Sequence, residues 1–323
     1  MNKKDISESF TVELDNDTEL RADRYIADYL GLFKRSQIKN RNVRVLLKGK
    51  EIKLGKMLNS GDIITVEYNH LPPPDIVPEK IELDIIYEDR NSIVMNKHQG
   101  IVVHPGAGNF TGTLVHGLLY HCLDMKDKFP RDDIRPGIVH RLDKDTSGVI
   151  ISAKNPDALE FLSSQFRNKS AHKSYLAIVK GVPVKPEGRI ETFITRDQNN
   201  RKKFTVSESR GKKAVTIYKV IKAWNNFSLL HLKLETGRTH QLRVHMLFLG
   251  NPILGDSIYG RKSGIFPDIS LMLHAYRLSL VLPGDIDKIS TFKAPVPLRF
   301  SKVVNRLSSS SEDIFSLISL IQD

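Results

Sequence analysis

The chain has 323 residues, of which 40% are hydrophobic and 27% are charged. That composition is typical of a folded globular protein, and it excludes a collagen-like chain, a disordered polymer and a disulfide scaffold. The length predicts about two domains. Lysine and arginine number 49 against 37 aspartates and glutamates, so the formal charge of +12 favours a polyanionic partner.

Cysteine content and hydropathy restrict the chemistry and the compartment. The single cysteine, Cys122, excludes an internal disulfide and a zinc site built from several thiolates. The opening residues lack the apolar core of a signal peptide. No stretch approaches the roughly 18 apolar residues of a membrane span. We therefore expect a cytoplasmic protein with no membrane partner.

Residues 11–70 are expected to form a small N-terminal module. Tyr25, Ile26, Tyr29 and Leu30 are spaced like the apolar face of a short helix. Strands with glycine turns are expected at 43–47 and 63–68.

The charge of this module is uneven. Nine lysines or arginines lie between residues 31 and 60, against the single acid Glu51. A run of like charge is often only a solvated face, but this excess favours a surface that contacts phosphates. The candidate RNA-binding residues of the module are Lys34, Arg35, Lys39, Arg41, Arg44 and Lys48.

Three consecutive prolines open a predicted linker over 71–79, because they interrupt any helix or central strand. A second domain is expected over 80–305, and an amphipathic tail over 306–323. In the tail, Ser309 and Glu312 are placed as a capping box, and the helix that follows is expected to pack on its own domain.

The second domain combines many strands with few helices. Strands are expected at 93–96, 101–104, 138–142, 149–151, 175–179, 214–221 and 227–235. Helices are expected at 156–166, which opens with proline, and at 239–249, which ends before a glycine. Because the helices are too few for a regular series of strand–helix–strand units, the predicted fold class is mixed α+β.

Several familiar chemistries leave no motif in the sequence. The phosphate-binding loop, the dinucleotide fingerprint, the serine-hydrolase elbow and the zinc-protease pair are all missing. Histidine pairs such as His116 and His121 are five residues apart, whereas ligands on one helix face lie about three or four apart. We therefore expect neither a metal nor a cofactor.

The segment 136–148 runs from apolar residues into Asp143, a polar turn closed by Gly148, and a second apolar stretch. A charged residue pressed against apolar strands is usually held there for a reason. The alternative is that Asp143 or Asp145 only orders the turn through the backbone, and the residues alone leave both interpretations open.

The segment 235–250 places Arg243 and His240 beside a buried stripe of Leu242, Met246 and Leu249. An arginine in this position commonly extends its charged end to solvent. An aspartate partner would instead make it useful, because the fixed positive charge orients the carboxylate.

Together these segments resemble the RluA-type family (RluA- and RluD-like) of large-subunit rRNA pseudouridine synthases. The matching blocks are Val102–Asn109, His140–Gly148, Lys173–Ala177, Thr236–Met246 and Gly250–Gly260. The resemblance covers about residues 80–300. The N-terminal module is similar to the α-L RNA-binding domain of the ribosomal protein S-four type, with Asn42 where that domain usually has glycine.

The resemblance implies a mainly antiparallel pseudouridine synthase fold and isomerisation of uridine in large-subunit rRNA. It assigns Asp143 as the catalytic carboxylate, Tyr175 as the residue that packs against the flipped base, and Arg243 as the partner of Asp143. The substrate-binding residues implied with these are Arg141, His140, Leu142, Thr146 and His240. Asp143 could act as a nucleophile or remove a sugar proton, and the sequence leaves that choice open.

A second basic run, between residues 199 and 219, favours a long RNA footprint over a hairpin that is merely kept soluble by charge. Its candidate RNA-binding residues are Arg201, Lys202 and Lys203. We expect a monomer with RNA, and not DNA, as its partner.

Two other functions compete with this interpretation. A non-catalytic rRNA-binding or ribosome-assembly protein would also be basic. A family member that had lost its activity is expected to have lost one of the three catalytic residues, and this sequence keeps all three. A hydrolase that releases uracil would need a second carboxylate to activate water, and the sequence offers no evident candidate.

Overall fold

The computed structural model divides the chain into two compact units, residues 1–75 and 76–323. The described residues are 4–14, 18–32, 38, 42–70, 76–106, 108–129, 135–200, 202–285, 287–308 and 313–321. The boundary falls inside the segment expected to be a linker, whose three prolines lie outside the described residues. No helix in the described part of the chain is long and apolar enough to cross a membrane.

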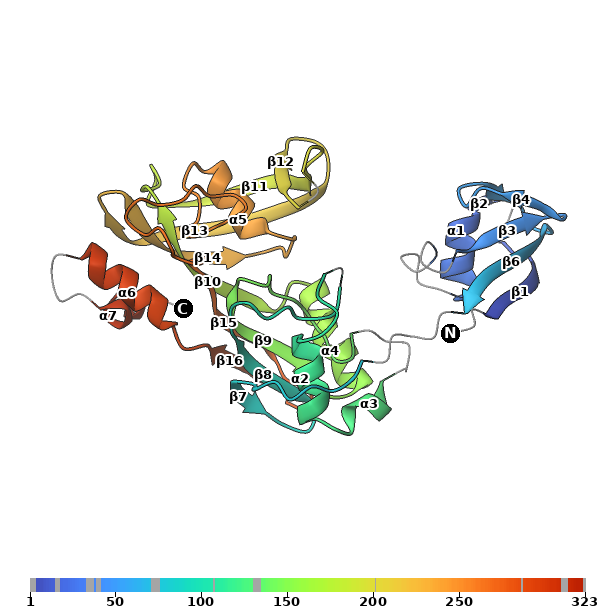
Figure 1. Cartoon of the computed structure of the whole chain (residues 1–323), viewed down its shortest axis with the longest axis horizontal. Coiled ribbons are helices and arrows are strands. Elements are labelled where there is room, and N and C mark those ends of the chain that lie inside the picture. Colours follow the sequence, from blue (N-terminus) through green and yellow to red (C-terminus); the bar gives the residue numbers. More distant parts are fainter. Residues whose placement is uncertain are drawn as a thin grey trace. The chain divides into compact units, whose positions relative to one another are not determined.

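The N-terminal unit contains an antiparallel sheet in the order β1-β6-β3-β4 and a short helical segment (Figure 1). Its elements are β1 (Lys4–Thr11), β2 (Leu20–Arg21), α1 (Ala22–Arg24), the π-helical turn η1 (Tyr25–Tyr29), β3 (Arg44–Leu47), β4 (Lys50–Ile52), β5 (Met57–Leu58) and β6 (Ile63–His70). The expected helix is therefore present as α1 and η1, which bury Tyr25 and Ile26 in the core of this unit. The expected strands are β3 and β6.

The hairpin between β3 and β4 turns through Lys48 and Gly49, whose φ angles are 50° and 76°. Two consecutive residues with positive φ give a tight turn that matches the twist of the strands. Asn42, ahead of β3, has a φ of 49°. Asparagine adopts this left-handed conformation more readily than most residues, so Asn42 can stand where the related domain usually has glycine.

The C-terminal unit is built on a ten-stranded sheet in the order β12-β11-β13-β14-β10-β15-β9-β8-β7, with β16 paired to β15. The strands are β7 (Ile85–Glu88), β8 (Ser92–Lys97), β9 (Ser147–Ala153), β10 (His172–Lys180), β11 (Glu187–Arg196), β12 (Phe204–Ser207), β13 (Lys212–Trp224), β14 (Phe227–Leu234), β15 (Leu273–Val281) and β16 (Ile289–Lys293). Among these described pairs, only β9 and β15 run parallel. The fold is mixed α+β with a mainly antiparallel sheet, as expected.

Helices cover parts of this sheet (Figure 1). They are α2 (Leu114–His121), α3 (Met125–Lys128), α4 (Pro156–Arg167), α5 (Gln241–Phe248), α6 (Leu298–Leu307) and α7 (Ile314–Ser319). Pro156 opens α4 as expected, and the side chain of Asn155 caps it. The tail helix α7 contacts α6 and β13 and buries Ile314 and Leu317, so it packs on its own unit.

Two helices begin at different residues from those that the sequence pattern predicted. The second expected helix starts late, at Gln241, because His240 has a φ of 57° and cannot continue a right-handed helix. The N-cap of α7 is Asp313, whose carboxylate accepts two amide hydrogen bonds from the first turn. The expected capping box of Ser309 and Glu312 lies outside the described residues.

Two segments expected as strands, 101–104 and 138–142, are not strands, apart from a bridge between Ile138 and Ser152. Backbone carbonyls of the first segment accept hydrogen bonds from the start of α2 instead. The second segment reaches β9 beyond the Ser147 and Gly148 pairs of β15, and there the His140 ring nitrogen Nε2, not a backbone carbonyl, accepts the Ile151 amide hydrogen bond at 3.1 Å. It therefore runs outside the sheet and carries Asp143 at its end.

Gly148 allows the close approach of the two parallel strands. Its φ is 117°, and a Cβ atom at this position would lie 2.1 Å from the Ala275 carbonyl oxygen and 2.6 Å from the Ala275 nitrogen. Both contacts are with backbone, which cannot rotate away as a side chain can. The glycine that follows Ser147 in the Asp143 segment is therefore required by packing.

We expect Gly148→Ala to lower the free energy of unfolding by about 3 kcal/mol, because alanine combines backbone strain with a clash. Urea denaturation followed by circular dichroism measures this change. Gly264→Ala is the matched control, since a Cβ at Gly264 meets nothing within 4 Å. Equal stability of the two variants would show that β9 and β15 do not approach in this way.

Candidate active site

Asp143 lies in a loop whose backbone is fixed by side chains from the end of β8 and from the residues that follow it. The buried ammonium group of Lys97 donates a hydrogen bond to the Lys144 carbonyl at 3.1 Å. The side-chain amide of Gln99 donates to the Asp145 carbonyl at 2.6 Å. These bonds hold the loop against the end of β8, so the position of the Asp143 carboxylate is set by neighbouring backbone.

Lys97 is a residue that the sequence analysis missed. Its ammonium group also donates to the carbonyls of His98 and Ile101, at 2.8 and 2.9 Å. Burial lowers the pKa of Lys97 to about 8, although the charges of Asp143 and Asp145 oppose that lowering. A lysine just after the apolar residues 93–95 of a strand is the signal that could have identified it.

Two cationic or ionisable groups lie close to the Asp143 carboxylate. Arg243 Nη1 is 3.5 Å from Asp143 Oδ2, and His240 Nε2 is 3.8 Å from the same oxygen. The Asp143 side chain remains 20% exposed. Arg243 and Asp143 therefore lie at ion-pair distance, and the carboxylate is still accessible from the cavity.

The shorter contacts of Arg243 are with Asp256, a residue that the sequence analysis did not single out. Arg243 Nε and Nη2 donate to the two Asp256 carboxylate oxygens at 2.7 and 2.8 Å. Asp256 is fully buried, and burial alone would raise its pKa. The hydrogen bonds and charge of Arg243 outweigh burial and hold the pKa of Asp256 below its ordinary value. Asp256 lies within the block Gly250–Gly260 that matches the family, so the sequence contained a signal that could have identified it.

Buried polar contacts fix the helix that carries Arg243. The Gln241 side-chain amide donates to the Val215 carbonyl at 2.9 Å, and its carbonyl oxygen accepts from the Arg238 amide at 3.0 Å. His245 Nδ1 lies 2.8 Å from the Thr216 hydroxyl. The start of α5 is thus attached to β13, which limits the movement of Arg243 relative to the sheet.

His240 is oriented by Tyr259. The phenol oxygen of Tyr259 accepts a hydrogen bond from the Phe204 amide at 2.8 Å and lies 2.8 Å from His240 Nδ1. If the phenol donates to Nδ1, neutral His240 carries its proton on Nε2, which faces Asp143. Burial lowers the pKa of His240, although the charge of Asp143 opposes this, so the neutral ring predominates at neutral pH.

These residues surround a cavity of about 120 Å³. It is lined by Arg141, Leu142, Asp143, Thr146, Tyr175, Leu234, Gly237, Arg238, Thr239, His240, Gln241, Leu242, Arg243 and Leu273. Tyr175 comes from β10, in the centre of the sheet. Burial, followed by the charge of Asp143, raises the pKa of Tyr175, so its phenol stays neutral at physiological pH.

His140 is the one predicted substrate-binding residue that does not line this cavity. Its ring stacks on Phe166 with centroids 4.5 Å apart, and its Nε2 accepts the Ile151 amide hydrogen bond at 3.1 Å. Burial lowers the pKa of His140 to about 3. These contacts tie the segment before Asp143 to α4 and β9.

The predicted RNA-binding residues lie in both units. Lys48 is exposed at the tip of the β3–β4 hairpin, whereas Arg44 forms an ion pair with Glu67. Lys202 and Lys203 precede β12, whose Phe204 contacts His240 in the active site. Lys34, Arg35, Lys39, Arg41 and Arg201 lie outside the described residues.

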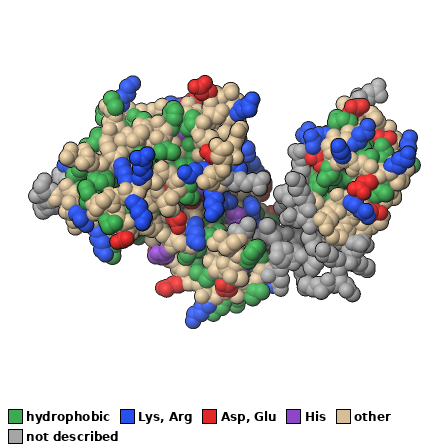
Figure 2. All heavy atoms as spheres, turned by 45° about the horizontal axis from the view of Figure 1, so that its top comes forward, with side chains coloured by type: hydrophobic (Ala, Val, Ile, Leu, Met, Phe, Trp, Pro, Cys, Tyr) green, Lys and Arg blue, Asp and Glu red, His purple; other side chains and the backbone are tan. Residues whose placement is uncertain are grey.

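The surface charge agrees with the composition. Figure 2 shows lysine and arginine side chains on both units, and they outnumber acidic side chains on the face presented. A positive surface attracts phosphates at long range, so it would raise the rate of encounter with RNA.

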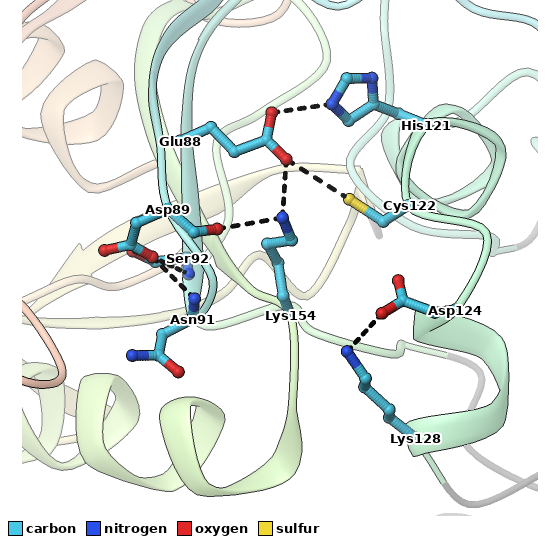
Figure 3. Close-up of polar contacts among 9 residues, drawn as sticks. All are labelled: Glu88, Asp89, Asn91, Ser92, His121, Cys122, Asp124, Lys128 and Lys154. Carbon is cyan, nitrogen blue, oxygen red and sulfur yellow. Dashed lines mark hydrogen bonds and ion pairs between the residues drawn. The ribbon is translucent and has the colours of Figure 1, made fainter.

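A second cluster of titratable groups joins β7, α2 and the end of β9 (Figure 3). Glu88 accepts hydrogen bonds from Lys154 at 2.7 Å and pairs with His121 at 2.8 Å. The ligand atoms of Glu88, His121 and Cys122 lie within 4.8 Å of one another, a grouping that metals also use. Because the Lys154 ammonium already supplies positive charge to this carboxylate, the contacts fit an ion-pair network that fastens three elements together.

We expect Glu88→Gln to lower the free energy of unfolding by about 1 kcal/mol at neutral pH. Burial raises the pKa of Glu88, but the hydrogen bonds from Lys154 and His121 outweigh it and lower that pKa. The stabilisation is therefore present above the unfolded-state pKa of roughly 4.3 and is lost as pH falls through the folded value. Urea titrations at neutral and acidic pH measure it, with Glu160→Gln, in an exposed pair with Arg167, as the control.

Comparison with known proteins identifies the family. The sequence model described as RNA pseudouridylate synthase matches residues 91–248, which include Asp143, Tyr175 and Arg243. The chain is 47% identical to a ribosomal large subunit pseudouridine synthase D of Borreliella burgdorferi, over 95% of this chain and 94% of that protein. It is 41% identical to an uncharacterized RNA pseudouridine synthase of Chlorobaculum parvum, over 90% of this chain and 94% of that one.

A solved structure gives the same result. Human RNA pseudouridylate synthase domain containing 4 is 27% identical, with a TM-score of 0.54, and the match covers 69% of this chain and 92% of that one. The sequence and fold comparisons thus agree. The chain belongs to the RluA-type family of RNA pseudouridine synthases, and it is an isomerase that acts on RNA.

Proposed function

We propose that the chain isomerises uridines of large-subunit rRNA and that Asp143 is the group that acts on the target nucleotide. The observation that carries this proposal is the accessible Asp143 carboxylate, 3.5 Å from Arg243 at a cavity that also exposes Tyr175. The choice of rRNA rests on the similarity to the Borreliella burgdorferi protein, which is named for the large ribosomal subunit.

The reaction places specific demands on such a site. The bond between ribose C1′ and uracil N1 breaks, and a bond between C1′ and C5 forms. C5 loses a proton and N1 gains one, so the isomerisation balances without an oxidant or a reductant. An ionised Asp143 can attack C1′, stabilise positive charge there or remove a sugar proton, and each role requires the charged carboxylate.

The neighbouring residues supply orientation and a receiving surface. The buried Arg243 holds Asp143 at the cavity, and Asp256 holds Arg243. A target base must leave its stack to reach Asp143, at a cost of a few kcal/mol. The neutral phenol of Tyr175 can pack against that base and donate a hydrogen bond, and the Arg141 guanidinium can stack on a base.

We further propose that the N-terminal unit is an RNA-binding domain of the ribosomal protein S-four type. Its support is the exposed Lys48 at the hairpin tip, the basic run around it, and the left-handed Asn42 ahead of β3. The unit has its own hydrophobic core, so it would fold around this surface independently of the catalytic unit.

The proposal is tested by incubating the purified chain with unmodified transcripts of large-subunit rRNA, small-subunit rRNA and tRNA. Carbodiimide labelling and reverse transcription then locate new pseudouridines. We expect them at discrete positions of the large-subunit transcript alone. Pseudouridine confined to tRNA would overturn the substrate assignment, and release of free uracil would indicate a hydrolase.

A further inference from the structure

The face of the sheet opposite the active cavity carries a second set of polar residues. Side chains alternate along a strand, so Ser174 points away from the face that Tyr175 presents to the cavity. Ser174 pairs with Lys233 of β14 and with Arg277 of β15. The three residues therefore form a row across the rear of the sheet.

Two adjoining cavities of about 500 and 660 Å³ lie on this face and share Ile217 and Lys233. We call them together the rear groove. Its basic lining residues on this face are Lys169, His172, Arg189, Lys219, Lys233 and Arg277. Lys173 also borders the groove, but its ammonium group lies over the Phe166 ring, 5.2 Å from the ring centroid. Within the described part of the chain, Lys219 and Lys233 form no ion pair.

Acidic residues balance few of these charges. The acids that line the groove are Glu187 and Glu235. Glu235 is already paired with Arg189, at 2.9 Å. The groove therefore keeps an excess of positive charge over a surface that is concave enough to hold a chain of phosphates.

Two buried polar atoms at the groove have no hydrogen-bond partner among the described residues, Ser174 Oγ and His231 Nε2. Their residues are only 4% and 5% exposed. Buried polar atoms are nearly always paired, so unpaired ones need an explanation. Burial, then the charges of Lys233, Arg277 and Lys219, lowers the pKa of His231 to about 4, so the ring is neutral and can donate to an anionic oxygen.

The backbone conformation of Lys169 is a further indication that positive charge at the rear groove has a function. Lys169 follows the end of α4 with a φ of 63°, a conformation that favours glycine at this position of a helix end. A lysine here costs backbone strain, and in return it places a positive charge on the groove.

We propose that the rear groove binds the phosphate backbone of an RNA segment distinct from the one that carries the target uridine. The proposal rests on the proposed rRNA substrate, because only a large folded RNA reaches both faces of the sheet. Ser174 and His231 would donate hydrogen bonds to phosphate oxygens, and Lys219 and Lys233 would neutralise their charge.

The test compares the double variant Lys219→Gln/Lys233→Gln with Lys80→Gln/Lys288→Gln, which removes the same charge from exposed lysines elsewhere. Affinity for a long large-subunit rRNA fragment is measured against salt concentration, beside isomerisation of a short stem-loop that contains the target. The logarithm of the association constant falls as the logarithm of the salt concentration rises. We expect the groove variant to make this slope shallower by about 1.5 and to weaken binding about tenfold. Its activity on the stem-loop should equal that of the parent chain.

A variant that makes the groove more positive is expected to change the affinity in the opposite direction. Glu187→Gln removes an acid from the groove and is expected to tighten binding of the long fragment. Equal salt slopes for the groove and control variants would overturn the proposal. Failure of the parent chain to modify the stem-loop would instead count against the proposed substrate, and the binding measurements would still report on the groove.

Discussion

Asp143→Asn is expected to reduce isomerisation by at least about 10³-fold, on the scale at which removing a nucleophile or a base acts. Asparagine keeps the size and shape of the side chain but lacks the negative charge that all three possible roles require. RNA affinity should stay within about twofold, because the phosphate contacts lie elsewhere. Single-turnover formation of pseudouridine, followed by release of tritium from C5 of uridine, measures the rate.

The matched control for this variant is Asp145→Asn, two residues along the same loop. The backbone carbonyl of Asp145 accepts the hydrogen bond from Gln99, and asparagine keeps that carbonyl while removing the carboxylate charge that acts on Lys97. The Asp145 side chain does not line the cavity. We therefore expect activity within a few fold of the parent chain. Comparable losses in both variants would mean that the loop, and not the Asp143 carboxylate, determines the rate.

Asp256→Asn has the second largest expected effect. It leaves the buried Arg243 without its bidentate partner, and breaking one side of a buried ion pair typically destabilises by about 3–5 kcal/mol. The guanidinium is then free to move onto Asp143, 3.5 Å away, and to cover the carboxylate. We expect activity to fall about 100-fold even where the variant is folded, with a larger effect on kcat than on KM.

A second variant separates positioning from stability. Arg243→Met/Asp256→Leu replaces the buried pair with apolar residues of similar size, and such replacements are often neutral for stability. Asp256 also accepts the Ile258 and Tyr259 amide hydrogen bonds, both at 2.9 Å, which leucine cannot replace. We therefore expect the double variant to melt above Asp256→Asn but below the parent chain, and to remain inactive because nothing then orients Asp143. Recovery of activity together with stability would show that the ion pair serves the fold alone.

The local elements of this protein could be predicted from the sequence. Pro156 and the apolar spacing after it define α4, and the apolar run after Phe227 defines β14. These signals lie within a few adjacent residues, where backbone propensity and side-chain periodicity act directly. Asp143, Tyr175 and Arg243 were assigned by the resemblance to the family, because each belongs to a contiguous matching block of residues. All three line one cavity.

Contacts between distant residues were decided by the tertiary structure. The segment 138–142 has the composition of a strand, yet the start of β9 pairs with β15, more than a hundred residues later, and the His140 ring accepts the Ile151 amide hydrogen bond further along. Asp256 and Tyr259 orient Arg243 and His240 only because the chain returns to α5 after its end. Local periodicity carries no information about which strand fills an edge or which carboxylate meets a buried arginine, since both depend on how the whole sheet is connected.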